Sequence, residues 1–306
     1  MAVPIFMIIS GFVYSKSFDA NKIVSIENAY AFPNIYKKVM RFTIPFIIAF
    51  LIEEIAIVMS GTASITIFEI IFSFLKGGVG PGSYYYPIMI QFIFVFPVIY
   101  FIIKRHDFNG VIICGIINFV YELLKSAYSM NEECYRLLVF RYILVIAFGA
   151  YLAVGKQKIN YKVCIMSIII GIVYISTLLY CDYPPVIITY WQGTSFIACL
   201  YILPISTLLI KIPFKCKLLE ILGRASYNIF LVQKIYYTGI DFMYNIIGNR
   251  IIQLFVNIII CTLVGVLFYY IETPITKFVL NKVDKSWKRS QIKCQYKKPN
   301  EEKHEG

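Results

Sequence analysis

The chain has 306 residues, of which 59% are hydrophobic and only 15% are charged. Soluble domains are typically about 45–50% apolar and about 25% charged, and a soluble fold of this length could not bury so much apolar surface. The composition therefore argues against a disordered chain, a nucleic-acid-binding protein and an ordinary cytosolic enzyme. The net charge of +12 is typical of a membrane protein whose cytoplasmic Lys and Arg residues fix its orientation.

Long apolar segments recur along the whole chain. A helix needs roughly 20 mostly apolar residues to cross a bilayer. The shorter run 65–75 contains Glu69, and we expect it to be an interfacial or re-entrant segment. The predicted fold is an all-α, polytopic bundle of about nine transmembrane helices in the plasma membrane. The nine predicted spans are 2–14, 42–59, 84–103, 108–124, 137–155, 163–180, 186–210, 219–239 and 251–271.

Basic residues are distributed unevenly between the segments that join these spans. If the segment 15–41 lies inside, 23 Lys and Arg residues fall in inner segments or at the inner end of a span, and four fall in outer segments. This asymmetry follows the positive-inside rule, and treating 65–75 as a further span would weaken it. We therefore expect a cytoplasmic C-terminus. The polar, basic segment 281–306 is typical of a disordered cytoplasmic tail near lipid headgroups.

The first predicted span, 2–14, is short for a membrane helix. No basic segment precedes it and no small-residue cleavage site follows it, so it is not a signal peptide. A further helix before Met1 would restore both the length and the orientation of this region. We therefore expect the sequence to be an N-terminal truncation, or to start at a misassigned residue.

The sequence predicts no metal site and no bound cofactor. Its eight cysteines form no CxxC pair and lie mostly in apolar segments, where they act as small hydrophobes. The two histidines, His106 and His304, lie beside polar and charged residues. The Gly-rich segment 77–87 lacks the GK[ST] of a P-loop and indicates a turn-rich outer loop with interfacial tyrosines. No GxSxG or HExxH motif occurs.

Lys37, Lys38 and Arg41 lie where the inner segment meets the second span. Lys38 and Arg41 are three residues apart, so on a helix they share a face. Two cations at a cytoplasmic membrane edge can bind phosphate or pyrophosphate. Topology anchoring explains the same residues, and spacing alone favours that interpretation.

Charged residues also occur within or beside the spans, at Glu53, Glu54, Glu122, Arg141 and Lys234. Such charges are costly in a membrane and are usually paired or face a polar cavity. All five are predicted near the outer side, which indicates an outward-facing polar pocket. Snorkelling to the interface is the alternative.

Aromatic residues are abundant, with 25 Tyr and 25 Phe. Most fit membrane belts and helix packing. Trp191 and Gln192 could instead stack on and hydrogen-bond a sugar.

Six segments of the sequence are informative when they are taken together and in order. They are FMIISGF at 6–12, KKVMRFTIPF at 37–46, YYYPIMIQFIFVFP at 84–97, RYILVIAFGAYL at 141–152, LGRASYNIFLVQ at 222–233 and YYIETPITK at 269–277. In content, order and spacing this set resembles the acyltransferase family 3 membrane proteins, which are O-acyltransferases of surface polysaccharides and other extracytoplasmic glycans. The resemblance covers roughly residues 1–280, with 281–306 as the tail.

The resemblance implies ten spans with both ends cytoplasmic, one more than predicted here. It implies that Lys38-Val-Met-Arg41 corresponds to the family's R-x-x-R element and binds the phosphates of an acyl-CoA co-substrate. Lys in place of the first Arg loses a bidentate fork. The family's first helix, with the His expected to act as base, would lie upstream of Met1, so the catalytic residue is unknown. The family often has His where this chain has Gln233.

Three functional hypotheses remain open at this point. The first is a membrane enzyme that transfers an acyl group, expected to be acetyl, from acyl-CoA to a hydroxyl of a cell-surface polysaccharide, and that is inactive if its base lies upstream. The second is a transporter or exporter of polysaccharide or lipid-linked sugar, although no inverted repeat of broken helices is evident. The third is a non-catalytic membrane remnant.

Overall fold

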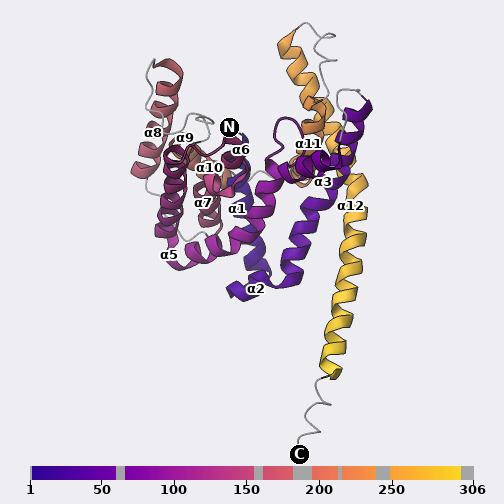
Figure 1. Cartoon of the computed structure of the whole chain (residues 1–306). Helices are drawn as coiled ribbons and strands as arrows, with labels where there is room; N and C mark the ends of the chain where they lie inside the picture. Colours follow the sequence, from indigo (N-terminus) through magenta and orange to yellow (C-terminus); the bar gives the residue numbers. More distant parts are fainter. Residues whose placement is uncertain are drawn as a thin grey trace, which may run out of the picture. The chain divides into compact units, whose positions relative to one another are not determined.

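The computed structural model describes residues 2–59, 66–154, 161–181, 195–212, 216–238 and 249–297. These residues form helices joined by short turns, and no strand occurs among them, which confirms the predicted all-α fold (Figure 1). In chain order the elements are α1 (Ala2–Ala20), α2 (Ile26–Tyr30), α3 (Phe32–Met59), α4 (Ile67–Lys76), α5 (Tyr85–Ala127), α6 (Glu132–Leu137), the 3-10 helix η1 (Val139–Tyr142), α7 (Ile143–Val154), α8 (Tyr161–Tyr180), α9 (Phe196–Cys199), α10 (Ile202–Lys211), α11 (Lys217–Thr238) and α12 (Arg250–Lys297).

Each of the nine predicted spans contains helix in the part of the chain that the structure describes. Asp107 has non-helical torsion angles, φ 51° and ψ −127°, and breaks α5 between the predicted spans 84–103 and 108–124. Four described helices are long and apolar enough to cross a membrane: Phe32–Met59, Tyr85–Ala127, Lys162–Tyr180 and Arg250–Lys285. Two shorter apolar helices also occur among the described residues, Val139–Val154 and Phe196–Leu209.

Two helices extend beyond the boundaries expected from hydropathy. α3 begins at Phe32, ten residues before the predicted span 42–59, and so includes the basic cluster. α12 continues to Lys297, so the start of the segment expected to be disordered is helical. Lys, Arg and Gln favour helix when no Pro or Gly interrupts them, which is why a polar sequence can prolong an apolar helix.

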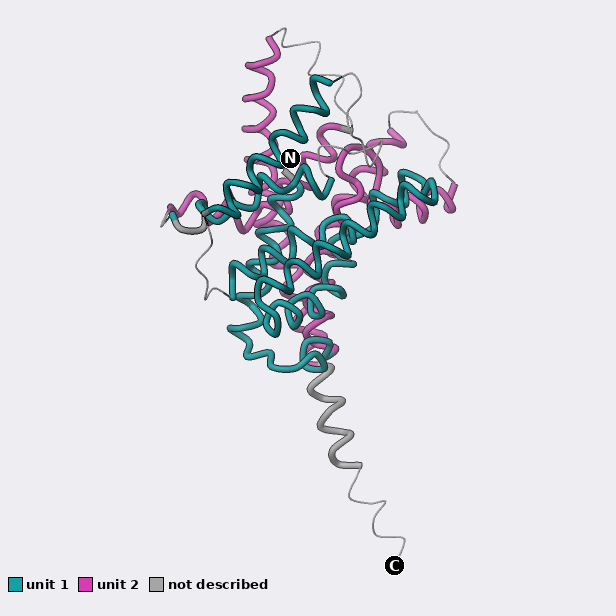
Figure 2. The backbone as a smooth tube through the Cα atoms, turned by 90° about the vertical axis from the view of Figure 1, so that its left-hand side faces the viewer, with its two compact units in different colours: residues 1–31, 87–215 teal, residues 32–86, 216–306 magenta. Residues whose placement is uncertain are grey.

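Contacts between helices divide the chain into two compact units (Figure 2). Unit 1 comprises residues 1–31 and 87–215, and unit 2 comprises residues 32–86 and 216–306. Each unit therefore combines segments that are far apart in the sequence.

In unit 1, α1 packs directly against α7 at two glycines. A Cβ atom at Gly11 would overlap the carbonyl group of Ile146, and one at Gly149 would overlap that of Ile8. Small residues let helix backbones approach closely, which is a common way for membrane helices to associate. The glycines therefore make this contact possible.

In unit 2, α11 packs against α12 and α3. Phe46 and Phe50 of α3 form a buried cluster with Leu231 of α11. Gly265 of α12 provides room for the backbone of Ile229, which a Cβ atom would overlap. These contacts hold α3 and α11 together at the level where both carry charged residues.

α4 is an amphipathic helix with no buried residue. Its N-terminus has a capping box, in which Glu69 N donates to Thr66 Oγ1 (3.3 Å) and Thr66 N donates to Glu69 Oε2 (2.8 Å). The Thr66 backbone amide, and the Thr66 hydroxyl, which donates to the same Glu69 Oε2 at 2.9 Å, lower the pKa of the Glu69 carboxyl. Ten residues extend only about 15 Å, too short to cross a bilayer, and the interfacial position predicted for 65–75 stays a prediction.

Candidate functional site

The basic cluster lies on the first turns of α3. Lys37 Nζ forms an ion pair with Asp284 Oδ2 of α12 at 2.8 Å, and both side chains are more than a third exposed. Lys38 is half-buried and Arg41 is exposed. Because Lys38 and Arg41 are three residues apart on a continuous helix, their side chains emerge from the same face. The structure therefore brings these two cations together and ties Lys37 to a neighbouring helix.

A buried ion pair lies farther along α3. Glu53 Oε2 accepts a hydrogen bond from Lys234 Nζ of α11 at 2.7 Å, and the side chains are only 1% and 4% exposed. Lys234 Nζ also donates to the backbone carbonyl of Gly77 at 2.8 Å. The Val79 amide interacts with the same carboxylate, while Glu53 Oε1 meets no donor at hydrogen-bonding geometry in the described part of the chain. The Glu53 carboxylate therefore retains one oxygen, Oε1, that can accept a hydrogen bond.

A glycine-rich loop covers this ion pair. Gly77 ends α4 with φ 87°, and Gly78 follows with φ 90°, a conformation that residues with a Cβ atom rarely adopt. A Cβ atom at Gly78 would also overlap Lys234 Nζ and Glu53 Oε2. Gly78 therefore allows the backbone to lie directly on the charged groups.

The remaining unit 2 residues of the predicted pocket lie around this pair. Glu54 is partly buried and accepts a hydrogen bond from Ser73 Oγ of α4 at 3.1 Å. Gln233 neighbours Lys234 in the sequence, but its side chain is exposed within unit 2. Adjacent residues on a helix point about 100° apart, so Gln233 and Lys234 cannot both face the Glu53 carboxylate.

A second buried charged cluster lies in unit 1. Arg141 is 2% exposed, and its guanidinium lies 4.9 Å from the ring centre of Tyr135 and 4.8 Å from that of Tyr142. It interacts electrostatically with Glu122, which is fully buried. Glu122 Oε1 accepts a hydrogen bond from the backbone amide of Phe196 at 2.6 Å. This cluster ties α5, η1 and α9 together.

The residues predicted to form one outward-facing pocket belong to both units, and a shared pocket stays a prediction. Glu53 and Glu54 belong to unit 2, whereas Arg141 belongs to unit 1. Trp191 and Gln192 lie outside the described residues. Within the described part of the chain, no three His, Cys, Asp or Glu side chains gather closely enough to hold a metal ion.

Two residues of the unit 2 cluster were not assigned their roles from the sequence. Lys234 was noted as a charge within a span, but its pairing with Glu53, 181 residues away, has no local signal. Gly78 was attributed to a turn-rich loop. Consecutive glycines beside a membrane span are the only sequence signal for such a close approach.

The unit 2 arrangement joins two chemical environments through one helix. α3 carries exposed and half-buried cations at its first turns and, twelve residues beyond Arg41, the carboxylate of Glu53, which pairs with the Lys234 ammonium of α11. Cations of this type bind phosphate groups. A carboxylate positioned by a buried ammonium can accept a proton from a hydroxyl held beside it.

Comparison with known proteins identifies the family. Residues 1–271 match the model of a family described as "Acyltransferase domain", acyltransferase family 3. Searches of curated proteins and of solved structures found no match. The matched region includes the basic cluster, the ion pair, the glycine-rich loop and the apolar helices. Because this match covers most of its length, the chain belongs to acyltransferase family 3, a family of membrane acyltransferases.

Proposed function

We propose that the protein is a membrane O-acyltransferase that transfers an acyl group, acetyl in the simplest case, from acyl-CoA to a hydroxyl of a cell-surface polysaccharide. One observation carries this proposal. Within the family-matched region, α3 bears a phosphate-type cation cluster at its first turns and a buried, glycine-covered ion pair farther along. In this proposal the cation cluster binds the acyl donor, and the ion pair lies where the acyl group is transferred.

Lys38 and Arg41 bind the phosphates of the donor in this proposal. Their shared helix face supports a joint contact with one phosphate or pyrophosphate group. Arg41 supplies a planar fork of donors, whereas Lys38 supplies a point charge. Lys37 contributes mainly to the local positive field, because its ammonium already pairs with Asp284 at 2.8 Å.

The distance along α3 fits the shape of the donor. Twelve residues separate Arg41 from Glu53, about 18 Å along a regular helix. Coenzyme A carries its thioester at the end of a long, flexible pantetheine arm, far from its phosphates. A donor whose phosphates bind at Arg41 can therefore extend its thioester toward the level of Glu53.

The transfer is a nucleophilic substitution at the thioester carbonyl. The acceptor hydroxyl oxygen forms a bond to the acyl carbon, the carbon–sulfur bond breaks, and coenzyme A leaves as a thiolate that is then protonated. We assign acceptance of the hydroxyl proton to the Glu53 carboxylate, which Lys234 holds in place at 2.7 Å. The proton then has a route to the departing thiolate, so none is lost overall.

Donor binding tests the first half of this proposal. Arg41→Gln and Lys38→Gln each remove one charged contact to phosphate, worth about 1.5–3 kcal/mol. The dissociation constant for acetyl-CoA, measured on the purified chain, should then rise about 10- to 100-fold. Arg224→Gln is the matched control. Arg224 is also an exposed arginine of unit 2, and its Glu220 pair is solvent-exposed, so its loss should leave binding unchanged.

If the native chain and both cluster variants bound acetyl-CoA with equal affinity, the donor would not bind at Lys38 and Arg41 of α3. An equal loss of affinity in Arg224→Gln would show that only the general positive charge of unit 2 matters. Either result would contradict the assigned role of Lys38 and Arg41.

A further inference from the structure

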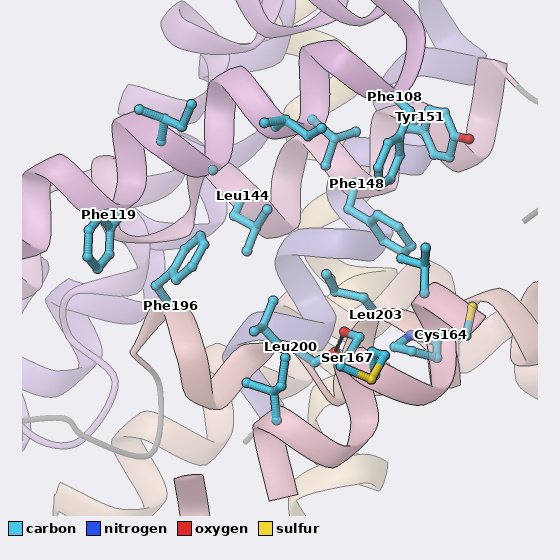
Figure 3. Close-up of a pocket in the computed structure, with 18 of the residues that line it drawn as sticks. Phe108, Phe119, Leu144, Phe148, Tyr151, Cys164, Ser167, Phe196, Leu200 and Leu203 are labelled. Atoms are coloured by element: carbon cyan, nitrogen blue, oxygen red, sulfur yellow. Dashed lines mark hydrogen bonds between the residues drawn. The ribbon is translucent and has the colours of Figure 1, made fainter. Parts of the chain in front are cut away.

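Unit 1 contains a cavity of about 860 Å³ that the family assignment does not explain. It lies between the second half of α5, α7, α8 and the α9–α10 region (Figure 3). Phe119 and Phe196 lie toward one end, while Phe148 and Tyr151 lie toward the other. Its volume is within the range of ligand pockets, about 300–1,000 Å³.

The interior of this cavity is apolar. The Ser167 hydroxyl, one of its few polar groups, already donates to the backbone carbonyl of Leu200 at 2.5 Å, shown as a dashed line in Figure 3. The backbone groups around it belong to helices. Water needs two to four polar partners to occupy a buried site, and this lining offers few. Hydrocarbon suits the interior better than water or a polar metabolite.

Several lining side chains are also exposed on the outside of the helices. Ile112 and Ile116 of α5 are 48% and 57% exposed, and Met166 of α8 is 57% exposed. In a membrane, such apolar surfaces face lipid. The cavity can therefore be entered sideways from the bilayer.

One charged residue, Lys162 in the first turn of α8, lines the cavity. Lys156 and Lys158 precede it in the sequence. Lys162 is exposed at the start of the apolar segment Lys162–Tyr180, which is long enough to cross a membrane. Basic residues at the ends of membrane helices attract anionic headgroups.

We propose that this cavity binds a hydrocarbon chain of an anionic phospholipid whose phosphate lies at Lys162. The apolar lining takes the chain, the exposed isoleucines and methionine provide the entry, and the lysine selects the negative headgroup. The site belongs to unit 1, whereas the donor site proposed on α3 belongs to unit 2.

The experiment uses the full chain in detergent and native mass spectrometry. Palmitoyl-oleoyl phosphatidylglycerol is compared with palmitoyl-oleoyl phosphatidylcholine, which has the same chains and no net charge. The native chain should bind phosphatidylglycerol more tightly. Lys162→Gln should weaken that binding about fivefold and leave phosphatidylcholine unaffected. Lys104→Gln, which changes an exposed lysine of the same unit outside the cavity, is the matched control and should bind both lipids as the native chain does.

Gly115→Leu tests the chain-binding part. A Cβ atom at Gly115 meets Leu144 and Phe196 at 3.3 and 3.4 Å, so the rest of the leucine side chain must enter the cavity. This variant should lose binding of both lipids at the site. Dihexanoyl phosphatidylglycerol, with the same headgroup and short chains, should bind the native chain much more weakly than the long-chain lipid.

Three results would overturn the proposal. One is equal affinity of the native chain for the two headgroups. Another is unchanged lipid binding in Lys162→Gln, which alters an exposed side chain and should fold normally. The third is tighter binding of palmitoyl-CoA than of phosphatidylglycerol, lost in Gly115→Leu, because it would assign the cavity to a long-chain acyl donor instead.

Discussion

Replacing the Glu53–Lys234 pair tests whether its charges serve stability, chemistry or both. The side chains are 1% and 4% exposed and their charged atoms are 2.7 Å apart. Removing one partner leaves the other charge buried and uncompensated, which costs about 3–5 kcal/mol. We therefore expect Glu53→Met and Lys234→Met each to lower the apparent melting temperature by about 6–10 °C.

The double replacement Glu53→Met/Lys234→Met removes both charges and keeps similar side-chain volume. Its remaining costs are the Gly77 carbonyl, which loses its Lys234 donor, and the Val79 amide, which loses the Glu53 carboxylate, together about 2–3 kcal/mol. The double variant should therefore melt within a few degrees of the native chain and well above either single variant. The coupling between the two changes should be at least about 3 kcal/mol.

Size-exclusion chromatography of heated, detergent-purified samples measures these melting temperatures. The same double variant separates the roles of the pair: it should be folded and yet fail to transfer acyl groups, because Glu53 no longer accepts a proton. Additive losses in the double variant would refute the reasoning on the buried pair. Full transfer activity in a stable double variant would refute the proton-accepting role of Glu53.

Three further perturbations have defined outcomes. Gly78→Ala should lower the melting temperature by several degrees, because the added Cβ atom would overlap the ion pair and the residue has a φ of 90°. Gly223 lies in open space on α11, so Gly223→Ala, the control, should leave stability unchanged or raise it by about 0.5–1 kcal/mol. Glu69 has a lowered pKa, so its capping contribution is present above the ordinary carboxyl pKa and is lost as pH falls through the lowered value; the stability difference between the native chain and Glu69→Ala should vanish in acid. Glu122→Ala should destabilise the chain by about 1–3 kcal/mol, since it leaves a buried backbone amide without its acceptor and removes a buried carboxylate that interacts electrostatically with Arg141, and a melting temperature unchanged from native would contradict this.

The membrane helices were predictable because their signal is local. A run of apolar residues is costly anywhere but in a bilayer or a core. Each predicted span therefore contains helix in the described part of the chain, and the break in α5 at Asp107 falls between two predicted spans. The placement of Lys38 and Arg41 on one helix face also follows from spacing alone, because α3 is continuous through both.

The tertiary pairings were not predictable in the same way. Glu53 pairs with Lys234 in unit 2 and Arg141 interacts electrostatically with Glu122 in unit 1, and neither partner could be chosen from the predicted depth of the charges. The depth of a residue in the membrane fixes only one of its three coordinates. Packing between segments far apart in the sequence decides which helices become neighbours. The role of Gly78 depends on such a neighbour as well, because its missing Cβ matters only once the ion pair lies beneath it.

The most direct test of the proposed function is acyl transfer in membranes that contain the chain. Acetyl-CoA labelled in the acetyl group is supplied together with envelope polysaccharide, and ester-linked label on the polysaccharide is released by mild alkali and counted. The proposal predicts alkali-labile label with the native chain and with Arg224→Gln, and its loss in Arg41→Gln. Label that forms equally in Arg41→Gln, or none with the native chain despite tight acetyl-CoA binding, would contradict it.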